Sequence, residues 1–341
     1  QQAEMRGEGK HDGVFALWYG KGPGVDRTGD VFRHANMAGT SPHGGVLAIA
    51  GDDHSGESST VVHQSDVALM DAMIPVLAAG GVQEIIDFGL MGYALSRYAG
   101  VWVGLKCVHD TVESAAVVEA GAGRVAPVIP KDHLLPPGGL SIRPSDDRIG
   151  QEERLHMHKL AAVKAFARAN ALNRITLQGG EAPSLGIVAA GKAYLDVRQA
   201  LSDLDIDEAA AARLGIRLLK IGMVWPLEPS IIREFAQGLS TIMVVEEKRS
   251  LIEAQLRAEL ARQLMISVYP DNVYSRGLNV YTTIQSKDQE WAYQSLREGV
   301  LDYTRRAPYP GPEAQLTMPA GIENDPAKLD EFLKISGREL L

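Results

Sequence analysis

Two glycine-rich polar segments near the start of the chain carry the side chains best suited to bind a ligand. The first, 20–27, contains Lys21, Gly22, Gly24, Asp26 and Arg27. The second, 51–59, contains Asp52, Asp53, His54, Ser58 and Ser59. Each follows a short apolar run that predicts a buried strand, and open α/β sheets bind ligands beyond the carboxyl ends of such strands. We therefore expect the stretch 19–65 to be the functional centre.

The first segment offers cations beside a backbone that can approach a ligand closely. Its glycines permit positive φ or close approach, and Lys21 or Arg27 could meet an anion. A tight strand-to-helix turn with solvated charges explains the same residues without a ligand. Neither GxGxxG nor GxxxxGK[ST] is present, so a mononucleotide site is not favoured.

The second segment and its surroundings offer neutral hydrogen bonds and several histidines. Ser58, Ser59 and Gln64 could bind a substrate, and His43 is placed near the same polar loops. No base stands beside either serine, so we assign no catalytic residue. His54 and His63 are nine residues apart, which fits no pair of helical metal ligands, and no metal site is predicted.

The elements that must position these residues alternate between strand and helix. The pattern predicts three strands that are buried on both faces, at 14–19, 45–50 and 101–108. It also predicts helices at 30–38, 61–73 and 82–98, and Thr28 is expected to cap the first of them. After a linker with five prolines at 127–144 and a helix at 151–170, it predicts a second unit. That unit has strands at 184–190, 216–221 and 241–245, helices at 193–204 and 229–239, a turn at 224–227 and a helix from Ser250. Beyond about residue 257 the alternation stops, with a strand at 278–284 and a helix at 289–305. The expected fold class is α/β with two mainly parallel sheets, followed by an α+β tail.

Composition excludes several classes of protein. The net charge of −9 and the lack of a Lys/Arg-rich run argue against a nucleic-acid partner. A single cysteine, Cys107, excludes a disulfide framework and an iron–sulfur cluster bound by this chain alone. No apolar run reaches the roughly 18 residues of a membrane span, so we expect a cytoplasmic protein. Because it opens on Gln1 rather than methionine, we expect a fragment.

Five ordered stretches resemble the indolepyruvate ferredoxin oxidoreductases, which are thiamine-diphosphate-dependent 2-oxoacid oxidoreductases. They are GEGKHDGVFALWYGKGPGVDR (7–27), FRHANMAGTSPHGGVLAIAGDDHSGESS (32–59), GVQEIIDFGLMGYALSRY (81–98), VGLKCVHDTVES (103–114) and VVEEKRSLIEAQLR (244–257). The resemblance implies a partial pyrimidine-binding domain at 1–120, a linker and helix at 121–182, and a transketolase C-terminal-like domain at 183–257. It implies oxidative decarboxylation of an aryl 2-oxo acid to an acyl-CoA, with ferredoxin as electron acceptor and a homo-oligomeric intact enzyme.

The same resemblance implies that only part of the cofactor site is present. Thiamine diphosphate with Mg²⁺ would contact the two polar segments, and His43, Ser58, Ser59 and Gln64 would face the substrate. The GDG…Asn signature of the Mg-diphosphate site is absent, because Asp53 replaces its second glycine. The family's iron–sulfur clusters and activating glutamate would also lie outside this chain. We therefore expect the isolated chain to be inactive.

The last part of the chain resembles a different family. The stretch 261–315 is similar to class A penicillin-binding proteins of the 1A type, in the region that joins the glycosyltransferase to the transpeptidase domain. The transpeptidase motifs SxxK, SxN and KTG are not found in it. We interpret 258–341 as a penicillin-binding-protein-like linker fragment, joined near 257–259 in a chimeric reading frame. The alternative function is a fragment of a bifunctional peptidoglycan synthase.

Overall fold

The structure is a computed structural model that describes residues 7–11, 13–56, 61–143 and 145–268. The predicted strand at 278–284, the predicted helix at 289–305 and the α+β tail lie outside these residues. Among the described helices, none combines the length and apolar character that a membrane span requires.

The first sheet has five strands in the order β1-β2-β4-β3-β8. They are β1 (Ala16–Lys21), β2 (Val46–Asp52), β4 (Trp102–Val108), β3 (Val76–Ala78) and β8 (Met223–Trp225). Strands β1, β2, β4 and β3 are parallel, and β8 pairs antiparallel with β3. Sequence analysis missed the short strand β3 and placed β8 within a turn. Three residues carry too little periodicity to be recognised without their partner strands.

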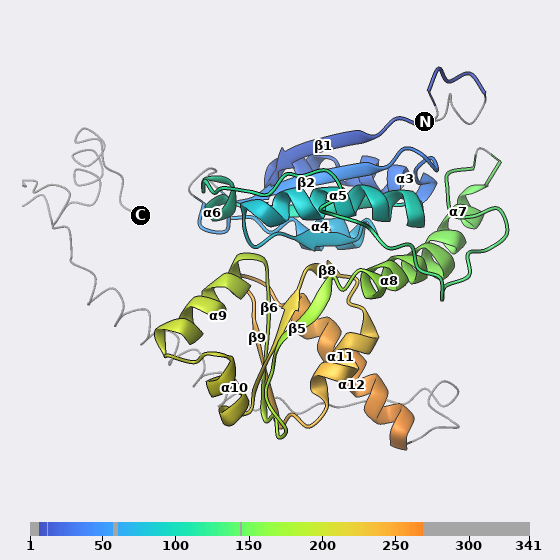
Figure 1. Cartoon of the computed structure of the whole chain (residues 1–341). Coiled ribbons are helices and arrows are strands. Elements are labelled where there is room, and N and C mark those ends of the chain that lie inside the picture. Colours follow the sequence, from blue (N-terminus) through green and yellow to red (C-terminus); the bar gives the residue numbers. More distant parts are fainter. Residues whose placement is uncertain (1–6, 12, 57–60, 144, 269–341) are drawn as a thin grey trace, which may run out of the picture. The chain divides into compact units, whose positions relative to one another are not determined.

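Helices cover both faces of this sheet (Figure 1). On one face α3 (Gly29–Ala38) and α4 (Asp66–Asp71) pack through Phe32 and Leu69. On the other, α5 (Val82–Ala99) packs through Leu95 against Leu47 and Leu105. The predicted helix at 82–98 is confirmed, and it ends at Gly100, whose φ of 64° suits a glycine C-cap.

A long helix links the first sheet to the second. It comprises α7 (Arg148–Arg154), a π-helical turn η1 (Leu155–Lys159) and α8 (Leu160–Ala169), which confirms the predicted helix at 151–170. The short α6 (His109–Val112) follows β4 and precedes the proline-containing linker.

The second sheet has the order β5-β7-β6-β9. Its strands are β5 (Asn173–Gln178), β7 (Ile216–Ile221), β6 (Leu185–Ala190) and β9 (Thr241–Val245), with only β5 antiparallel among these four. One face carries α9 (Gly191–Asp203) and α10 (Glu208–Leu214), and the other carries α11 (Pro229–Ala236) and α12 (Ile252–Val268) (Figure 1). The predicted mainly parallel α/β class is confirmed. Sequence analysis missed β5 and α10.

Three local predictions in the first unit are wrong. The glycine-rich segment 20–27 is not an open loop, because Gly22–Arg27 forms the helix α2. Strand β1 is not buried on both faces: it lies at the sheet edge, and Tyr19 is 78% exposed. The helix predicted at 61–73 is reduced to α4, since the hydrogen bonds of Ser65 to Asp52 set its start.

The prediction that Thr28 caps α3 is wrong for its side chain, which makes no capping hydrogen bond to that helix. Its hydroxyl instead donates to the carbonyls of Gly24 and Val25 in α2. A serine or threonine between two short helices can bond to either one, and here the preceding turn is nearer.

Candidate functional site

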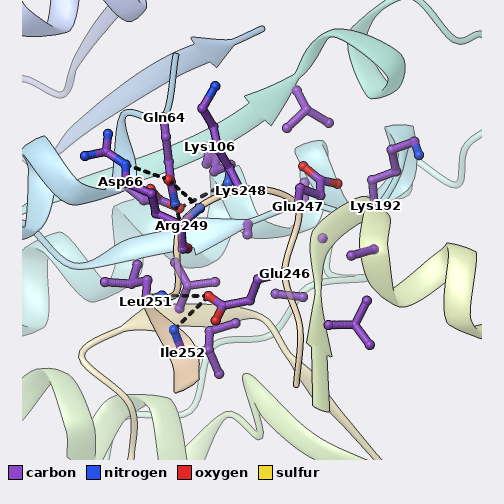
Figure 2. Close-up of a pocket in the computed structure, with 18 residues that line it drawn as sticks. Gln64, Asp66, Lys106, Lys192, Glu246, Glu247, Lys248, Arg249, Leu251 and Ile252 are labelled. Atoms are coloured by element: carbon purple, nitrogen blue, oxygen red, sulfur yellow. Dashed lines mark hydrogen bonds and ion pairs between the residues drawn. The ribbon is translucent and has the colours of Figure 1, made fainter. Parts of the chain in front are cut away.

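A narrow cleft lies where the carboxyl ends of strands from both sheets meet. The ends of β3 and β4 contribute Ala78 and Val108, and the ends of β6 and β9 contribute Ala190 and Val245. The cavity has a volume of about 40 Å³, which is room for a few water molecules. Its polar lining comprises Gln64, Asp66, Lys106, Lys192, Glu246, Glu247, Lys248 and Arg249 (Figure 2).

Asp52, at the end of β2, organises the loop that follows it. Its buried carboxylate accepts hydrogen bonds from the backbone nitrogen of Ser65 at 2.8 and 3.1 Å and from Ser65 Oγ at 2.5 Å. Asp53 closes the next turn by accepting from the backbone nitrogen of Gly56 at 2.7 Å. Both carboxylates are therefore engaged in folding the loop.

His63 connects this loop to α2. Its Nε2 lies 2.9 Å from Asp26 Oδ2, and its Nδ1 lies 3.8 Å from Asp52 Oδ1. A Cβ built on Gly22 would meet the ring of His63 at 1.9 Å. The missing side chain of Gly22 thus makes room for an imidazole of this chain.

His54 connects the same loop to the second sheet. Its Nδ1 lies 2.7 Å from the carbonyl oxygen of His63, and its Nε2 lies 2.9 Å from Glu247 Oε2 in the turn after β9. Burial acts to lower the pKa of His54, but the contacts with Glu247 and the His63 carbonyl outweigh it and the pKa is raised.

The turn after β9 is fixed by two further sets of hydrogen bonds (Figure 2). Gln64 Oε1 accepts from the backbone nitrogen of Arg249 at 3.0 Å and from its Nε at 3.2 Å, and Gln64 Nε2 donates to the Arg249 carbonyl at 3.3 Å. Glu246 accepts from the backbone nitrogens of Leu251, Ile252 and Glu253. Glu246 therefore closes the start of α12, as its position before a helix suggests.

Two lysines border the cleft. Lys106 Nζ lies 3.1 Å from the buried carboxylate of Asp66. Lys192, near the start of α9, lies 2.9 Å from Asp196 and 3.8 Å from Asp110. Burial acts to raise the pKa of Glu247, but His54 and the two lysines hold it below its usual range. Glu247 is thus ionised at neutral pH.

The structure brings together only part of the residues singled out in the sequence. Asp26, Asp52, Asp53, His54 and Gln64 belong to one connected network. Lys21, Gly22, Gly24 and Arg27 belong to the end of β1 and to α2 beside it.

One predicted substrate contact, His43, lies away from this network. His43 precedes β2, so it lies at the opposite end of that strand from Asp52. Ser58 and Ser59 lie outside the described residues.

Sequence analysis missed several members of this network. Asp66, Lys106, Glu247 and Arg249 were assigned no site role. Lys106 and Asp66 carried a usable signal, because a charge within or next to an apolar run needs a partner when the run is buried. The contact between His54 and Glu247 joins residues far apart in sequence, and no spacing rule reveals it.

The network tests how well this edge could hold a diphosphate and its metal ion. A diphosphate needs convergent N–H groups and cations, and its Mg²⁺ takes carboxylate oxygens, but the carboxylates of Asp52 and Asp53 already accept hydrogen bonds within the loop. Among the described residues, no group of three or more His, Cys, Asp or Glu side chains is placed to hold a metal ion. The described residues of this edge therefore show no preformed cluster of metal ligands, and the expected lack of a complete magnesium diphosphate site stays a prediction.

Comparison with known proteins shows that the chain is similar to the indolepyruvate oxidoreductases. The family model of the indolepyruvate oxidoreductase domain matches residues 175–301. Indolepyruvate oxidoreductase subunit IorA of Methanothermobacter marburgensis is 28% identical over 246 residues, covering 72% of this chain and 38% of that protein. The subunit IorA of Pyrococcus horikoshii is 25% identical over 248 residues. The resemblance to the indolepyruvate oxidoreductases is confirmed.

A solved structure supports the fold of the indolepyruvate oxidoreductase-like region. The 2-oxoglutarate:ferredoxin oxidoreductase of Magnetococcus marinus superposes with a TM-score of 0.50 at 17% identity, covering 71% of this chain and 48% of that one. The present chain spans little more than a third of the length of the IorA proteins it matches.

The second resemblance is confirmed as well. Penicillin-binding protein 1A of Pseudomonas aeruginosa is 42% identical over 65 residues, which are 19% of this chain and 8% of that protein. The match to the indolepyruvate oxidoreductase domain extends past 257–259, where the sequence placed the join. The position of that join stays a prediction.

Proposed function

We propose that this chain supplies one wall of the active site of a 2-oxoacid:ferredoxin oxidoreductase that acts on an aryl 2-oxo acid such as indolepyruvate. One observation carries the proposal. A connected polar network lies at the carboxyl ends of strands from both sheets, within the region that resembles the indolepyruvate oxidoreductase subunits. In α/β proteins this is the place where ligands bind.

The intact enzyme would use thiamine diphosphate with Mg²⁺, CoA, ferredoxin and iron–sulfur clusters. Thiamine diphosphate supplies the carbon nucleophile that allows a 2-oxo acid to lose carbon dioxide. The residues of this chain would position and enclose the reacting groups. Asp52 and Ser65 fix the loop after β2, while Gln64 and Arg249 hold the turn after β9 against it.

The isolated chain would be inactive in this proposal. The carboxylates of Asp52 and Asp53 are engaged within their own loop, and the chain's one cysteine, Cys107, is too few for a cluster. The intact enzyme would be a cytoplasmic homo-oligomer in which further polypeptide supplies the diphosphate anchor and the clusters.

The first experiment tests the isolated chain. Calorimetric titration of thiamine diphosphate with Mg²⁺ should show no tight binding, and indolepyruvate with CoA should not reduce a viologen dye. Tight magnesium-dependent binding would contradict the assignment of an incomplete site.

A second experiment tests the activity itself. The chain would be co-expressed with the part of the Methanothermobacter IorA protein that it does not match and with any other subunit that the relative requires. Viologen reduction should depend on this chain and fall when Gln64→Ala loosens the site wall, but not with the exposed control Glu181→Gln. A folded complex without activity would count against the proposed function.

The 65-residue likeness to a penicillin-binding protein supports a second proposal for the tail. We infer that it derives from a chimeric reading frame and confers no penicillin-binding activity. Fluorescent penicillin should give no labelled band, and sequencing genomic DNA across codons 255–262 should reveal a discontinuity. One continuous locus would contradict the chimera.

A further inference from the structure

His54 has a hydrogen-bond acceptor on each side of its ring. Nδ1 lies 2.7 Å from the carbonyl oxygen of His63, which can only accept. Nε2 lies 2.9 Å from a carboxylate oxygen of Glu247. The side chain of His54 is 15% exposed and that of Glu247 is 23% exposed, so water does not readily replace either contact.

The two contacts differ in kind: the first is a hydrogen bond, whereas the second is an ion-pair contact whose N–H does not point directly at the carboxylate oxygen. A carbonyl carries no proton, so the proton of the first contact belongs to His54 Nδ1. At the second contact Glu247 is ionised, because His54, Lys106 and Lys192 favour its charged form. An unprotonated Nε2 would place its lone pair 2.9 Å from that carboxylate, so the repulsion favours a proton on Nε2. Both ring nitrogens of His54 therefore carry protons, and the side chain is an imidazolium.

This arrangement joins two segments that are distant in sequence. His54 lies in the loop after β2 of the first sheet, and Glu247 lies in the turn between β9 and α12 of the second. We propose that His54 is a pH-dependent latch, which when protonated ties the turn after β9 to the loop after β2 and when neutral releases one of its two contacts. The latch does not depend on the reaction that the intact enzyme catalyses.

A second contact between the same two segments, beside the latch, involves the amide of Gln64, which does not titrate. The amide of Gln64 bonds to the backbone and side chain of Arg249, two residues after Glu247. Release of His54 would therefore loosen the border of the cleft without separating the two segments. The chain thus combines one permanent contact with one adjustable contact at the same turn.

The charged groups that face the pair favour the protonated state. Glu247 comes from the turn after β9, and Lys106 from β4 acts in the opposite direction, toward neutral His54. Lys192 from α9 acts on Glu247, and Asp66 pairs with Lys106 and offsets its charge. Burial and Lys106 lower the pKa of His54, but Glu247 and the His63 carbonyl raise it by more, so the pKa lies above its ordinary value.

The raised pKa of His54 determines whether its contribution to the stability of the fold grows or falls with pH. Because the pKa of His54 is higher in the folded chain than in the unfolded chain, its stabilisation is complete below about pH 6.5. It is lost as the pH rises through the folded value. The latch is closed in mildly acidic solution and opens toward alkaline pH.

The experiment uses the full chain and NMR titration of its histidine side chains. The resonance of His54, assigned by its loss in His54→Gln, should give a pKa above the ordinary histidine value of 6.5. Glu247→Gln should shift the His54 titration to lower pH. A His54 pKa at or below 6.5, or no shift in Glu247→Gln, would overturn the proposal.

A double-mutant cycle provides a readout that a purely structural role would not move. Urea unfolding of the wild type, His54→Gln, Glu247→Gln and the double variant would be compared at pH 6 and pH 8.5. The coupling between the two positions should be several-fold larger, as a ratio of unfolding constants, at pH 6. Equal coupling at both pH values would contradict the latch. If the variants do not fold, the His54 resonance is assigned by triple-resonance NMR of the isotope-labelled wild type, and its titration relative to the ordinary value of 6.5 still decides.

Discussion

Ser65 is bound to the carboxylate of Asp52 through both its backbone nitrogen and its hydroxyl. The two residues are separated by a loop, and both side chains are almost fully buried. This pair therefore sets where the loop after β2 ends and where α4 begins. The pair also fixes the positions of Gln64 and Asp66, which flank Ser65 in the sequence and line the cleft.

Asp52→Asn should destabilise the fold by about 1–3 kcal/mol, because a neutral amide replaces a carboxylate that accepts charge-assisted hydrogen bonds. Ser65→Ala should cost less, since the backbone nitrogen of residue 65 still donates to Asp52. Urea unfolding measures both changes, with Glu181→Gln as an exposed control. A smaller loss for Asp52→Asn than for Ser65→Ala would contradict this ranking.

Two glycines of α2 should respond oppositely to the same substitution. Gly22→Ala should destabilise the chain by about 1–3 kcal/mol, because its Cβ would collide with the ring of His63. Gly24→Ala meets no atom within 4 Å and should be neutral or stabilising by up to about 1 kcal/mol. Thermal and urea unfolding give the comparison. Similar effects at the two positions would show that His63 does not occupy the space beside Gly22.

Lys159 should make the stability of the fold rise with pH. Its Nζ is buried and donates to the carbonyl oxygens of Gly100 and Met37, at 3.0 and 3.4 Å, near the ends of α5 and α3. Burial, aided by Arg154, lowers the pKa of Lys159 to about 7. Between pH 7 and pH 10.5, the ordinary pKa of a lysine, this side chain is protonated in the unfolded chain but mostly neutral in the folded chain.

The free energy of unfolding should therefore increase above pH 7, by at most about 1.4 kcal/mol per pH unit from this group. Lys159→Met removes the titrating amine and should flatten the curve measured by urea unfolding at pH 6.5, 8 and 9.5. Identical slopes for the two proteins would count against a lysine that is neutral at pH 8.

Cys107 should be inert in the folded chain. Burial, with a smaller contribution from the charge of Asp52, raises the pKa of its thiol to about 11, and the side chain lies within the core of the first sheet. A thiolate is the reactive form, so an aromatic disulfide reagent at pH 8 should react only after denaturation. Denatured protein should then release one equivalent, because the chain has one cysteine. Rapid labelling of native protein would contradict the placement of this residue.

The sequence predicted the elements whose apolar pattern is long or continuous. Strand β9 has the predicted bounds, and α5 differs from its predicted range by one residue. The weak signals belong to short elements such as β3 and β8, which exist because another strand supplies their hydrogen bonds. The glycines of α2 suggested a loop, but Gly22–Arg27 is helical, and the missing side chain of Gly22 leaves space that His63 occupies.

The sequence by itself determined the α/β class, the two sheets and the polar segments that follow their strands, because periodicity and turn residues act locally. Only the tertiary structure decided which of those polar groups meet. His54 and Glu247, or Gln64 and Arg249, become partners because the carboxyl ends of strands from the two sheets meet at the same cleft. The tertiary structure also showed that Asp52 and Asp53 are engaged in folding their own loop, since hydrogen-bond partners depend on distances in space rather than along the chain.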